Sequence, residues 1–305
     1  MEQARPSPLN RPAASAKVCA VQENRCLHLD LDGAWDGAAL GLSTLDRRAW
    51  GPRLRFCAPD REMEAFHAAC AGELGAARFL VYGSGDFHHL SALWTRRLER
   101  KATLVSFDNH PDWDIRPPKW CCGSWLNRAL DLPQIEQISV WGCGNFECWG
   151  WHRVWGNHSD VRRGRLAVHP WADERSPEEQ ARPGSITRAN WREKFAAFAG
   201  GLHGKDLYVT VDIDGLRAED AVTNWENGRF SAEDVAWALD ELRRGGGRIV
   251  AGDLCGARSD AAYARRTQRF ASETDHPKLP PFDRAEAARI NGRSFATIWP
   301  RLTGE

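Results

Sequence analysis

Residues 103–112 read TLVSFDNHPD, and this stretch decides the fold. Its first half, Thr103 to Phe107, is a short apolar run that predicts a buried strand. Asp108, His110 and Asp112 follow at every second position, and a chain that leaves a strand in extended form presents such residues on one side. The stretch therefore predicts a strand whose end delivers two carboxylates and an imidazole to one pocket.

Working outward, similar apolar runs predict the other strands of a mostly parallel central sheet. They alternate with segments of helical periodicity, which is typical of βαβ units with helices on both faces. The predicted strands are Cys26 to Leu31, Arg78 to Tyr82, Gln137 to Trp141, Leu166 to Val168, Leu207 to Val211 and Arg248 to Ala251. The predicted helices are Glu62 to Leu74, Leu90 to Arg100, Asn190 to Phe198 and Ala232 to Arg243. We expect a three-layer α/β/α fold.

The length of 305 residues suits one large α/β domain, which we assign to residues 21–305. Residues 1–20 are rich in Pro, Ala and Ser and predict a flexible tail. Several Pro after Ser272 predict a carboxyl-terminal segment that wraps the surface.

Composition excludes several classes of partner. Lys plus Arg and Asp plus Glu each number 41, so the chain has no net charge that would favour nucleic acid. No run approaches the ~18 apolar residues of a membrane span, and the first residues lack the apolar core of a secretory signal. The nine Cys, an odd number in a long chain, favour reduced thiols. We expect a cytoplasmic protein that acts on a small molecule.

Acidic and imidazole side chains follow four of the predicted strands. The sets are Gly83-Ser84-Gly85-Asp86-Phe87-His88-His89, Asp108-Asn109-His110-Pro111-Asp112, Asp212-Ile213-Asp214-Gly215 and Gly252-Asp253. Ends of parallel strands meet at one edge of a sheet, where crowded carboxylates repel one another unless cations neutralise them. Two divalent ions would supply about four positive charges. Carboxylates with imidazoles, and no thiolate in these motifs, favour manganese.

The motifs resemble those of the arginase/agmatinase superfamily of ureohydrolases. Ser106 to Asp112 resembles the family's S-x-D-A-H-x-D, and Val211 to Leu216 resembles its S-x-D-x-D-x-x-D-P. Gly83 to His89 resembles its G-G-D-H-S loop with extra residues. The resemblance implies an arginase-like fold, a pair of Mn²⁺ ions per chain and, because ureohydrolases are commonly oligomeric, a homo-oligomer.

Carried over position by position, the resemblance also implies the ligands. One ion would take His88 or His89 with Asp108, Asp112 and Asp212, and the other would take His110, Asp108, Asp212 and Asp214. Asp108 and Asp212 would bridge the two ions. A hydroxide between them would attack a guanidinium or amidine carbon and cleave a C–N bond. Among the ligands, Asp108 and His110 are therefore also catalytic candidates.

Two departures from the family pattern concern the substrate rather than the metals. Cys122 begins the segment that resembles the family's H-G-x-x-F-R-R-A. A thiol therefore occupies the position at which the family has a proton-shuttle His. We treat Cys122 as a catalytic candidate for this reason. The family's D-x-V-E corresponds to Asp253-Leu254-Cys255-Gly256, without the Glu that contacts a guanidinium. The substrate is therefore a small nitrogenous compound of guanidino, amidine or formimino type, and arginine and agmatine are not favoured.

Other functions are weighed beside this one. A deacetylase-type amide hydrolase of the same superfamily, or a protein that binds metal without catalysis, would keep the ligands. Asp30-Leu31-Asp32-Gly33 resembles the motif of haloacid dehalogenase-type phosphatases, although no later Lys and Asp pair supports it. Cys121 or Cys122 as a nucleophile would need a paired His. Seven of the 15 Trp fall between 113 and 155 and indicate packing or an aromatic wall beside a cationic substrate.

Overall fold

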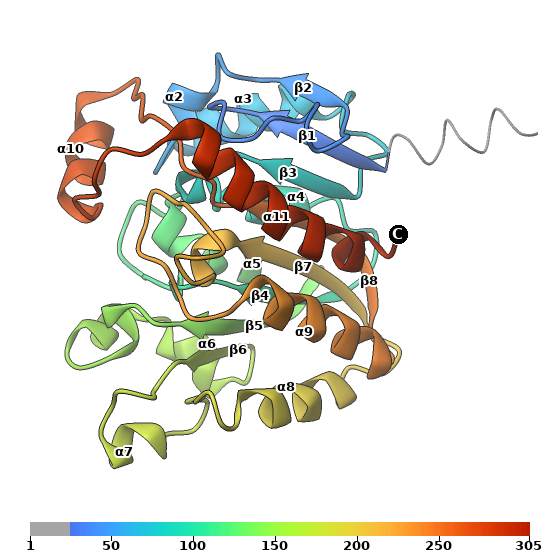
Figure 1. Cartoon of the computed structure of the whole chain (residues 1–305), viewed down its shortest axis with the longest axis vertical. Helices are drawn as coiled ribbons and strands as arrows, with labels where there is room; N and C mark the ends of the chain where they lie inside the picture. The colour runs from blue at the N-terminus through green and yellow to red at the C-terminus, as the bar shows by residue number, and fades with distance from the viewer. Residues whose placement is uncertain (1–24) are drawn as a thin grey trace, which may run out of the picture.

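The computed structural model describes residues 25–305, and the predicted tail, residues 1–20, lies outside them. An eight-stranded sheet runs through the middle of the molecule in the order β2-β1-β3-β8-β7-β4-β5-β6 (Figure 1). Every pair of neighbouring strands is parallel. The strands are β1 (Cys26–Asp30), β2 (Thr44–Asp46), β3 (Phe79–Tyr82), β4 (Ala102–Phe107), β5 (Ile135–Cys143), β6 (Leu166–Pro170), β7 (Asp206–Asp212) and β8 (Arg248–Cys255).

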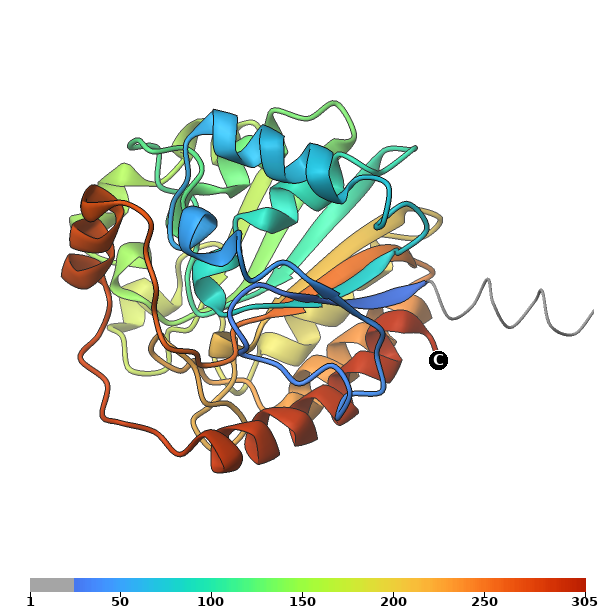
Figure 2. The same cartoon turned by 90° about the horizontal axis from the view of Figure 1, so that it is seen from above.

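Helices cover both faces of the sheet, so the three-layer α/β/α prediction is confirmed (Figure 2). Helices α2, α3 and α4 lie on one side, and α8, α9 and α11 lie on the other. The α-helices are α2 (Gly51–Leu54), α3 (Asp60–Cys70), α4 (Leu90–Thr95), α5 (Leu126–Leu130), α6 (His158–Arg162), α7 (Pro177–Gln180), α8 (Trp191–Gly200), α9 (Ala232–Arg244), α10 (Arg266–Asp275) and α11 (Arg284–Thr303). Short 3₁₀ helices are η1 (Gly85–Phe87), η2 (Cys122–Ser124), η3 (Phe146–Cys148), η4 (His152–Trp155) and η5 (Ile213–Gly215).

Each face of the sheet has its own apolar core. Phe66 of α3 and Trp94 of α4 pack on one face, and Phe195 of α8 and Leu239 of α9 pack on the other. Helix α9 shows the sequence rules clearly, because Ser231 caps it in a reciprocal capping box and its apolar residues share one face. The eight cysteines within the described residues are free, and no helix there is long and apolar enough to cross a membrane.

All of the predicted strands are present, but strand β2, the segment after Ser272 and the end of strand β8 differ from the predictions. Strand β2 was not predicted, because it is a three-residue edge strand in which only Leu45 is partly buried. The segment after Ser272 does not simply wrap the surface. It contains the 20-residue helix α11, which begins at an Asp283 cap and buries Phe295, Ile298 and Leu302 against the sheet layer.

Strand β8 is longer than predicted and changes the position of Asp253. The strand continues to Cys255, so Asp253 lies inside it rather than at the rim of the sheet. This carboxylate is wholly buried and accepts hydrogen bonds from the hydroxyls of Tyr82, Ser91, Tyr208 and Thr210. Four donors satisfy a buried carboxylate, so Asp253 belongs to the interior and not to the group of acids at the rim.

Candidate metal centre

The loops that follow β3, β4 and β7 meet at the carboxyl-terminal edge of the sheet. β4 and β7 are neighbours, with Phe107 opposite Val211, so Asp108 and Asp212 leave the sheet side by side. β3 lies beyond β8, and its loop turns through η1 to bring His88 toward them. Gly85 allows this approach, because a Cβ atom there would lie 2.8 Å from Asp212 Oδ2.

A hydrogen-bond chain from the sheet fixes the ring of His88. Its Nε2 lies 2.9 Å from Thr210 Oγ1, and Thr210 Oγ1 lies 2.6 Å from an oxygen of Asp253. A threonine hydroxyl has one proton, and the Asp253 carboxylate can only accept it. Thr210 therefore accepts from His88, so Nε2 carries a proton and Nδ1 faces the other way.

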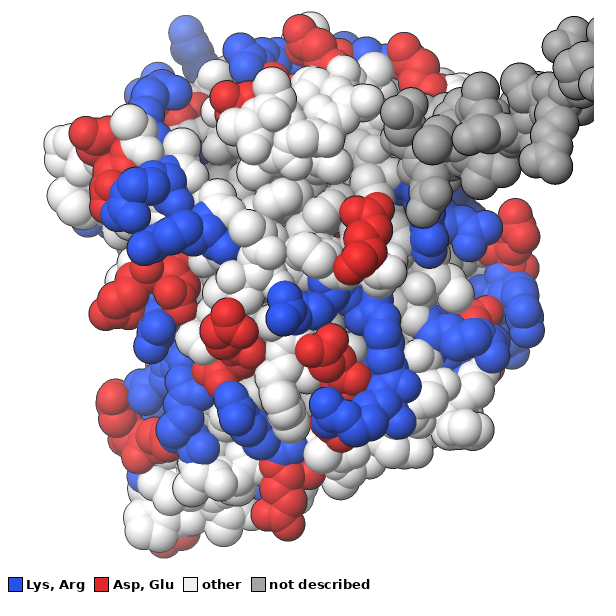
Figure 3. Space-filling view, turned by 45° about the vertical axis from the view of Figure 1, so that its right-hand side comes forward, with Lys and Arg blue, Asp and Glu red and all other residues white. Residues whose placement is uncertain are grey.

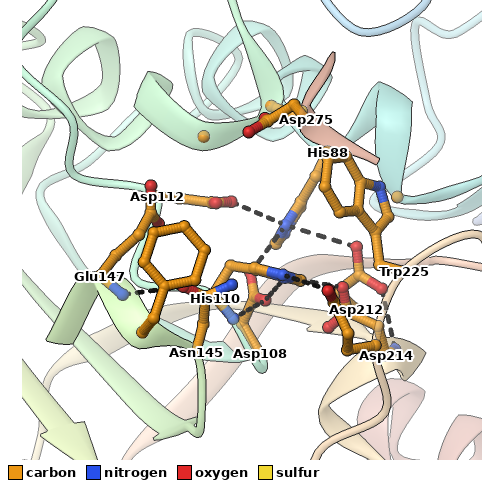
Figure 4. A pocket seen from close by; sticks show the side chains of 15 residues that line it. His88, Asp108, His110, Asp112, Asn145, Glu147, Asp212, Asp214, Trp225 and Asp275 are labelled. Carbon is orange, nitrogen blue, oxygen red and sulfur yellow. Dashed lines mark hydrogen bonds and ion pairs between the residues drawn. The ribbon is translucent and has the colours of Figure 1, made fainter. Parts of the chain in front are cut away.

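Three carboxylates converge on that Nδ1 atom. It lies 3.0 Å from Asp108 Oδ2, 3.2 Å from Asp112 Oδ2 and 3.7 Å from Asp212 Oδ2. In Figure 4 these side chains point toward one another, with His88 from the loop after β3, Asp108 and Asp112 from the loop after β4, and Asp212 from the end of β7. Three carboxylate oxygens and an imidazole nitrogen, all buried, need a positive charge between them. A proton on Nδ1 supplies one such charge, and a divalent ion would supply two.

A second group of ligands shares Asp108 with the first. His110 Nδ1 lies 2.9 Å from Asp214 Oδ2 and 3.6 Å from Asp108 Oδ1. Backbone N–H groups orient the carboxylates, since Asn109 N donates to Asp214 Oδ1 and Asp214 N donates to Asp212 Oδ1. The groups His88–Asp108–Asp112 and Asp108–His110–Asp214 each hold donor atoms close enough for one ion. The donor set therefore fits two adjacent cations that share Asp108.

Asp112 reaches the site through a turn rather than an extended chain. Its φ angle of 45° lies in the left-handed region, which Asp tolerates better than most residues. Trp125, wholly buried, donates from Nε1 to Asp112 Oδ2 over 2.5 Å and holds the carboxylate in place. Residues in such conformations cluster at functional sites.

The pKa values record the crowding of charges in the absence of cations. Burial and the Asp108 charge raise the pKa of Asp112 to about 7, and burial raises that of Asp214 to about 6 despite the opposing effect of His110. Burial opposes protonation of His88, but its bonds with Asp108 and Asp112 raise its pKa well above the ordinary value. Carboxylates that hold protons near neutral pH are those that a cation would ionise.

The structure separates the two adjacent histidines that the sequence left open. His89 is wholly buried, and neither ring nitrogen has a hydrogen-bond partner among the described residues. It does not line the cavity, and it belongs to none of the groups that could hold an ion. His89 is therefore not placed to ligate, because adjacent residues in the turn after η1 point their side chains in different directions.

Cys122 and Gly256, the two departures from the family pattern, both adjoin the cluster. Cys122 lines the cavity, and burial beside Cys121 raises the pKa of its thiol well above the ordinary value. This disfavours a thiolate nucleophile, and its role in proton transfer stays a prediction. Gly256 has a φ of 109°, and a Cβ atom there would lie 2.1 Å from Asp212 Oδ1. A Glu cannot occupy this position without displacing Asp212.

Several residues of the cavity were not found by sequence reasoning. The cavity of about 50 Å³ is lined by the candidate ligands together with Trp225, Glu226, Glu147 and Asp275 (Figure 4). Glu226 and Asp275 are exposed and lie at its mouth. Glu226 Oε2 lies 3.7 Å from His110 Nε2. Burial raises the pKa of Glu147 to about 7. These residues come from loops and from α10, without a motif that marks them. A third possible ligand group, His88–Asp212–Cys255, includes a thiol that also escaped notice.

The phosphatase-like motif near β1 has a structural role. Asp32 accepts hydrogen bonds from Arg55, from Ser259 and from the backbone of Ser84, and Asp30 pairs with Arg48. The nucleophile of that motif would be its first carboxylate, Asp30, whose two oxygens are engaged here by the Arg48 guanidinium and by the backbone N–H of Gly33. The second carboxylate, Asp32, is held by the buried guanidinium of Arg55. This arrangement gives no support to the phosphatase alternative.

Comparison with solved structures identifies the architecture. An arginase from Bacillus subtilis superposes with a TM-score of 0.54, at 11% identity, over 92% of this chain and 98% of the other. The chain has the arginase/agmatinase fold. A hypothetical agmatinase from Burkholderia thailandensis gives a TM-score of 0.50 at 16% identity, covering 92% of this chain and 87% of that one. Proclavaminate amidino hydrolase from Streptomyces clavuligerus gives 0.51 at 13% identity, covering 91% and 90%.

At the level of sequence the similarity to known proteins is more limited. No family model matches the chain. An uncharacterised protein from Thermotoga maritima is 27% identical over 177 residues, which is 57% of this chain. The chain spans 55% of the length of that relative. The arginase/agmatinase fold is therefore found here with a divergent sequence.

Proposed function

We propose that this chain is a hydrolase that holds two Mn²⁺ ions and cleaves a C–N bond of a small nitrogenous substrate. The observation that carries the proposal is the convergence of Asp108, Asp112 and Asp212 on Nδ1 of His88, at the strand ends of an arginase/agmatinase fold. His110 and Asp214 complete the set around the second position. Oxygen and imidazole donors of this kind suit manganese.

The ions, when bound, would lower the pKa of a water molecule and stabilise the negative charge that develops on the substrate. The chain's own residues orient and confine the reaction. Thr210 sets the ring of His88, and Trp125 sets the carboxylate of Asp112, so the donors are positioned before any ion arrives. Glu226, beside His110 at the mouth, would accept a proton from the attacking water and return it to the leaving nitrogen as the C–N bond breaks.

The residues at the mouth of the cavity also bear on the substrate. Glu147, Glu226 and Asp275 carry carboxyl groups, and none of the cavity-lining residues within the described range 25–305 is Lys or Arg. An anionic substrate would be repelled by these groups, so we propose a neutral or cationic one. Gly256 leaves no room for the Glu that the family uses on a guanidinium, which favours an amidine, formimino or acetylamino group over a free guanidinium.

Metal analysis is the direct test of this proposal. The full chain would be dialysed against Mn²⁺, freed of excess ion and analysed by mass spectrometry, and about two equivalents per chain are expected. Asp108→Asn should remove both, because Asp108 belongs to both groups. A panel of guanidino, formimino and acetylamino compounds would then identify the reaction. A wild-type chain that stays metal-free would refute the proposal, and a loaded chain without turnover on any compound would favour a binding protein.

A further inference from the structure

A second, larger hollow lies at the opposite end of the sheet from the metal cavity. Its volume is about 830 Å³, and it is lined by residues at the amino-terminal starts of the strands, among them Arg78 before β3 and Arg248 in β8. Figure 3 brings this side of the molecule forward and shows several groups of Lys and Arg side chains on it. A hollow of this size can bury much of a small organic ligand.

The hollow exists because the helical layer stops short on this side. Helix α4 ends at Thr95 after six residues, and the chain then turns away through Arg96 to Lys101. Val250 and Ala251 of the central strand β8 remain partly exposed as a result. Together with Leu80 and Trp94 they line part of the hollow, so it has an apolar surface as well as charged groups.

Arginines from separate segments of the chain converge on the hollow. Five of them line it, Arg25, Arg78, Arg97, Arg100 and Arg248, against the two acids Glu99 and Asp206. The difference, five minus two, is a local charge of plus three. Asp206 pairs with Arg248 and with Arg100, and Arg97 donates to backbone carbonyls. Arg25 and Arg78 have no carboxylate partner within residues 25–305.

Two residues that line the hollow also carry buried donors that lack acceptors. The Nε atom of Arg25 and the Nε1 atom of Trp94 are inaccessible and have no hydrogen-bond partner in the described part of the chain. Trp94 itself is 3% exposed. These two atoms are closed off from the hollow, so the donors that a negatively charged ligand could reach are the terminal guanidinium nitrogens of Arg25 and Arg78.

We propose that this hollow is a binding site for a nucleoside polyphosphate, separate from the metal cavity. Guanidinium groups bind phosphate oxygens in pairs, and Arg78 and Arg25 are free to do so. The partly exposed side chains of Leu98, Val250 and Ala251 would contact the nucleoside. The hollow and the metal cavity have no lining residue in common, so the ligand would be an effector and not a substrate.

Isothermal titration calorimetry on the full chain would test this, at low salt and with a chelator present so that metal–nucleotide complexes do not interfere. The probes are ATP, inorganic tripolyphosphate and adenosine. We expect saturable binding of ATP, weaker binding of tripolyphosphate and none of adenosine. Arg78→Ala should weaken ATP binding by about tenfold, which is typical for one charged contact. Arg293→Ala, at an exposed position of α11, is the matched control and should change nothing.

Several outcomes would overturn the proposal. Absence of ATP binding at about millimolar concentration would remove the site, and equal loss in the Arg78 and Arg293 variants would mean non-specific attraction. Tripolyphosphate binding as tight as ATP would refute the nucleoside part. Because the variant could also alter folding, thermal unfolding of Arg78→Ala without ligand should match the wild type. Metal content is measured separately, so failure here would leave the proposed hydrolase unaffected.

Discussion

Replacing Thr210 by Val tests whether the hydrogen-bond chain from Asp253 positions His88, the proposed metal ligand. Val keeps nearly the same shape and volume but removes the hydroxyl, so His88 Nε2 loses its acceptor and Asp253 loses one of its four donors. The side chain of Thr210 is wholly buried, and water cannot replace the bond at no cost. The His88 ring then has no fixed orientation toward Asp108.

The expected magnitude follows from the behaviour of other metal sites. Loss of a group that orients a ligating His typically lowers metal affinity by about 10–100-fold, or roughly 1.4–2.7 kcal/mol. The metal-free protein should also lose about 1–3 kcal/mol of stability, because a buried donor is left unsatisfied. Thr210→Ser restores the hydroxyl and should recover most of the affinity.

The assay is competition between the protein and a coloured chelator for Mn²⁺, which reports affinity without requiring turnover. Thr103→Val is the matched control, because Thr103 is also wholly buried in a strand but its hydroxyl has no hydrogen-bond partner within residues 25–305. Unchanged affinity in Thr210→Val, or an equal loss in both variants, would show that the chain from Asp253 does not position His88.

Three further predictions concern the cluster itself. Asp212→Asn should lower the Mn²⁺ content measured by mass spectrometry. Asp114→Asn should not, because Asp114 pairs with Arg116 outside the cavity. Equal losses of Mn²⁺ in the two variants would mean that the proposed ligand set is wrong. Cys122→Ser should reduce turnover of an identified substrate while metal stays bound, and unchanged turnover would exclude Cys122 from proton transfer. Burial raises the pKa of Asp112 to about 7, from an unfolded value near 4. The contribution of Asp112 to the stability of the metal-free chain is therefore fully present below about pH 4 and is lost as pH rises toward 7. Mn²⁺ should therefore raise the Tm more near pH 8 than near pH 5, and equal increments in scanning fluorimetry would contradict this.

Local sequence patterns predicted the strands and much of the cluster, though not always for the right reason. The spacing of Asp108, His110 and Asp112 assumed an extended chain, whereas the backbone at Asp112 is left-handed. The residues still meet because Trp125 holds Asp112 from a segment further along the chain. A pattern of period two selected residues that the structure brings together, and a tertiary contact supplies the geometry.

Residues that act from within regular structure could not be predicted in this way. Thr210 lies in the middle of a buried strand, where its sequence gives no sign that its hydroxyl contacts His88, 122 positions away. Asp253 was recognised in the sequence as an acid beside a predicted strand, but it was placed at the carboxyl-terminal rim of the sheet. The reason is that the apolar run at the start of β8 ends before the strand itself does. Asp275 comes from α10, which no apolar periodicity marked.

The geometry around Asp212 explains why the proposed metal ligands can be present while the Glu of the arginase/agmatinase pattern is missing. Gly256 turns with positive φ against Asp212, and any side chain at that position would strike the carboxylate. A chain that keeps this close turn cannot also carry a guanidinium-binding Glu there. In the proposed enzyme, substrate recognition would then come from other residues, and Glu147, Glu226 and Asp275 on three other segments are acidic groups that line the cavity. The same backbone turn that packs against Asp212 of the proposed metal centre therefore excludes the Glu contact that the sequence resemblance would imply at Gly256.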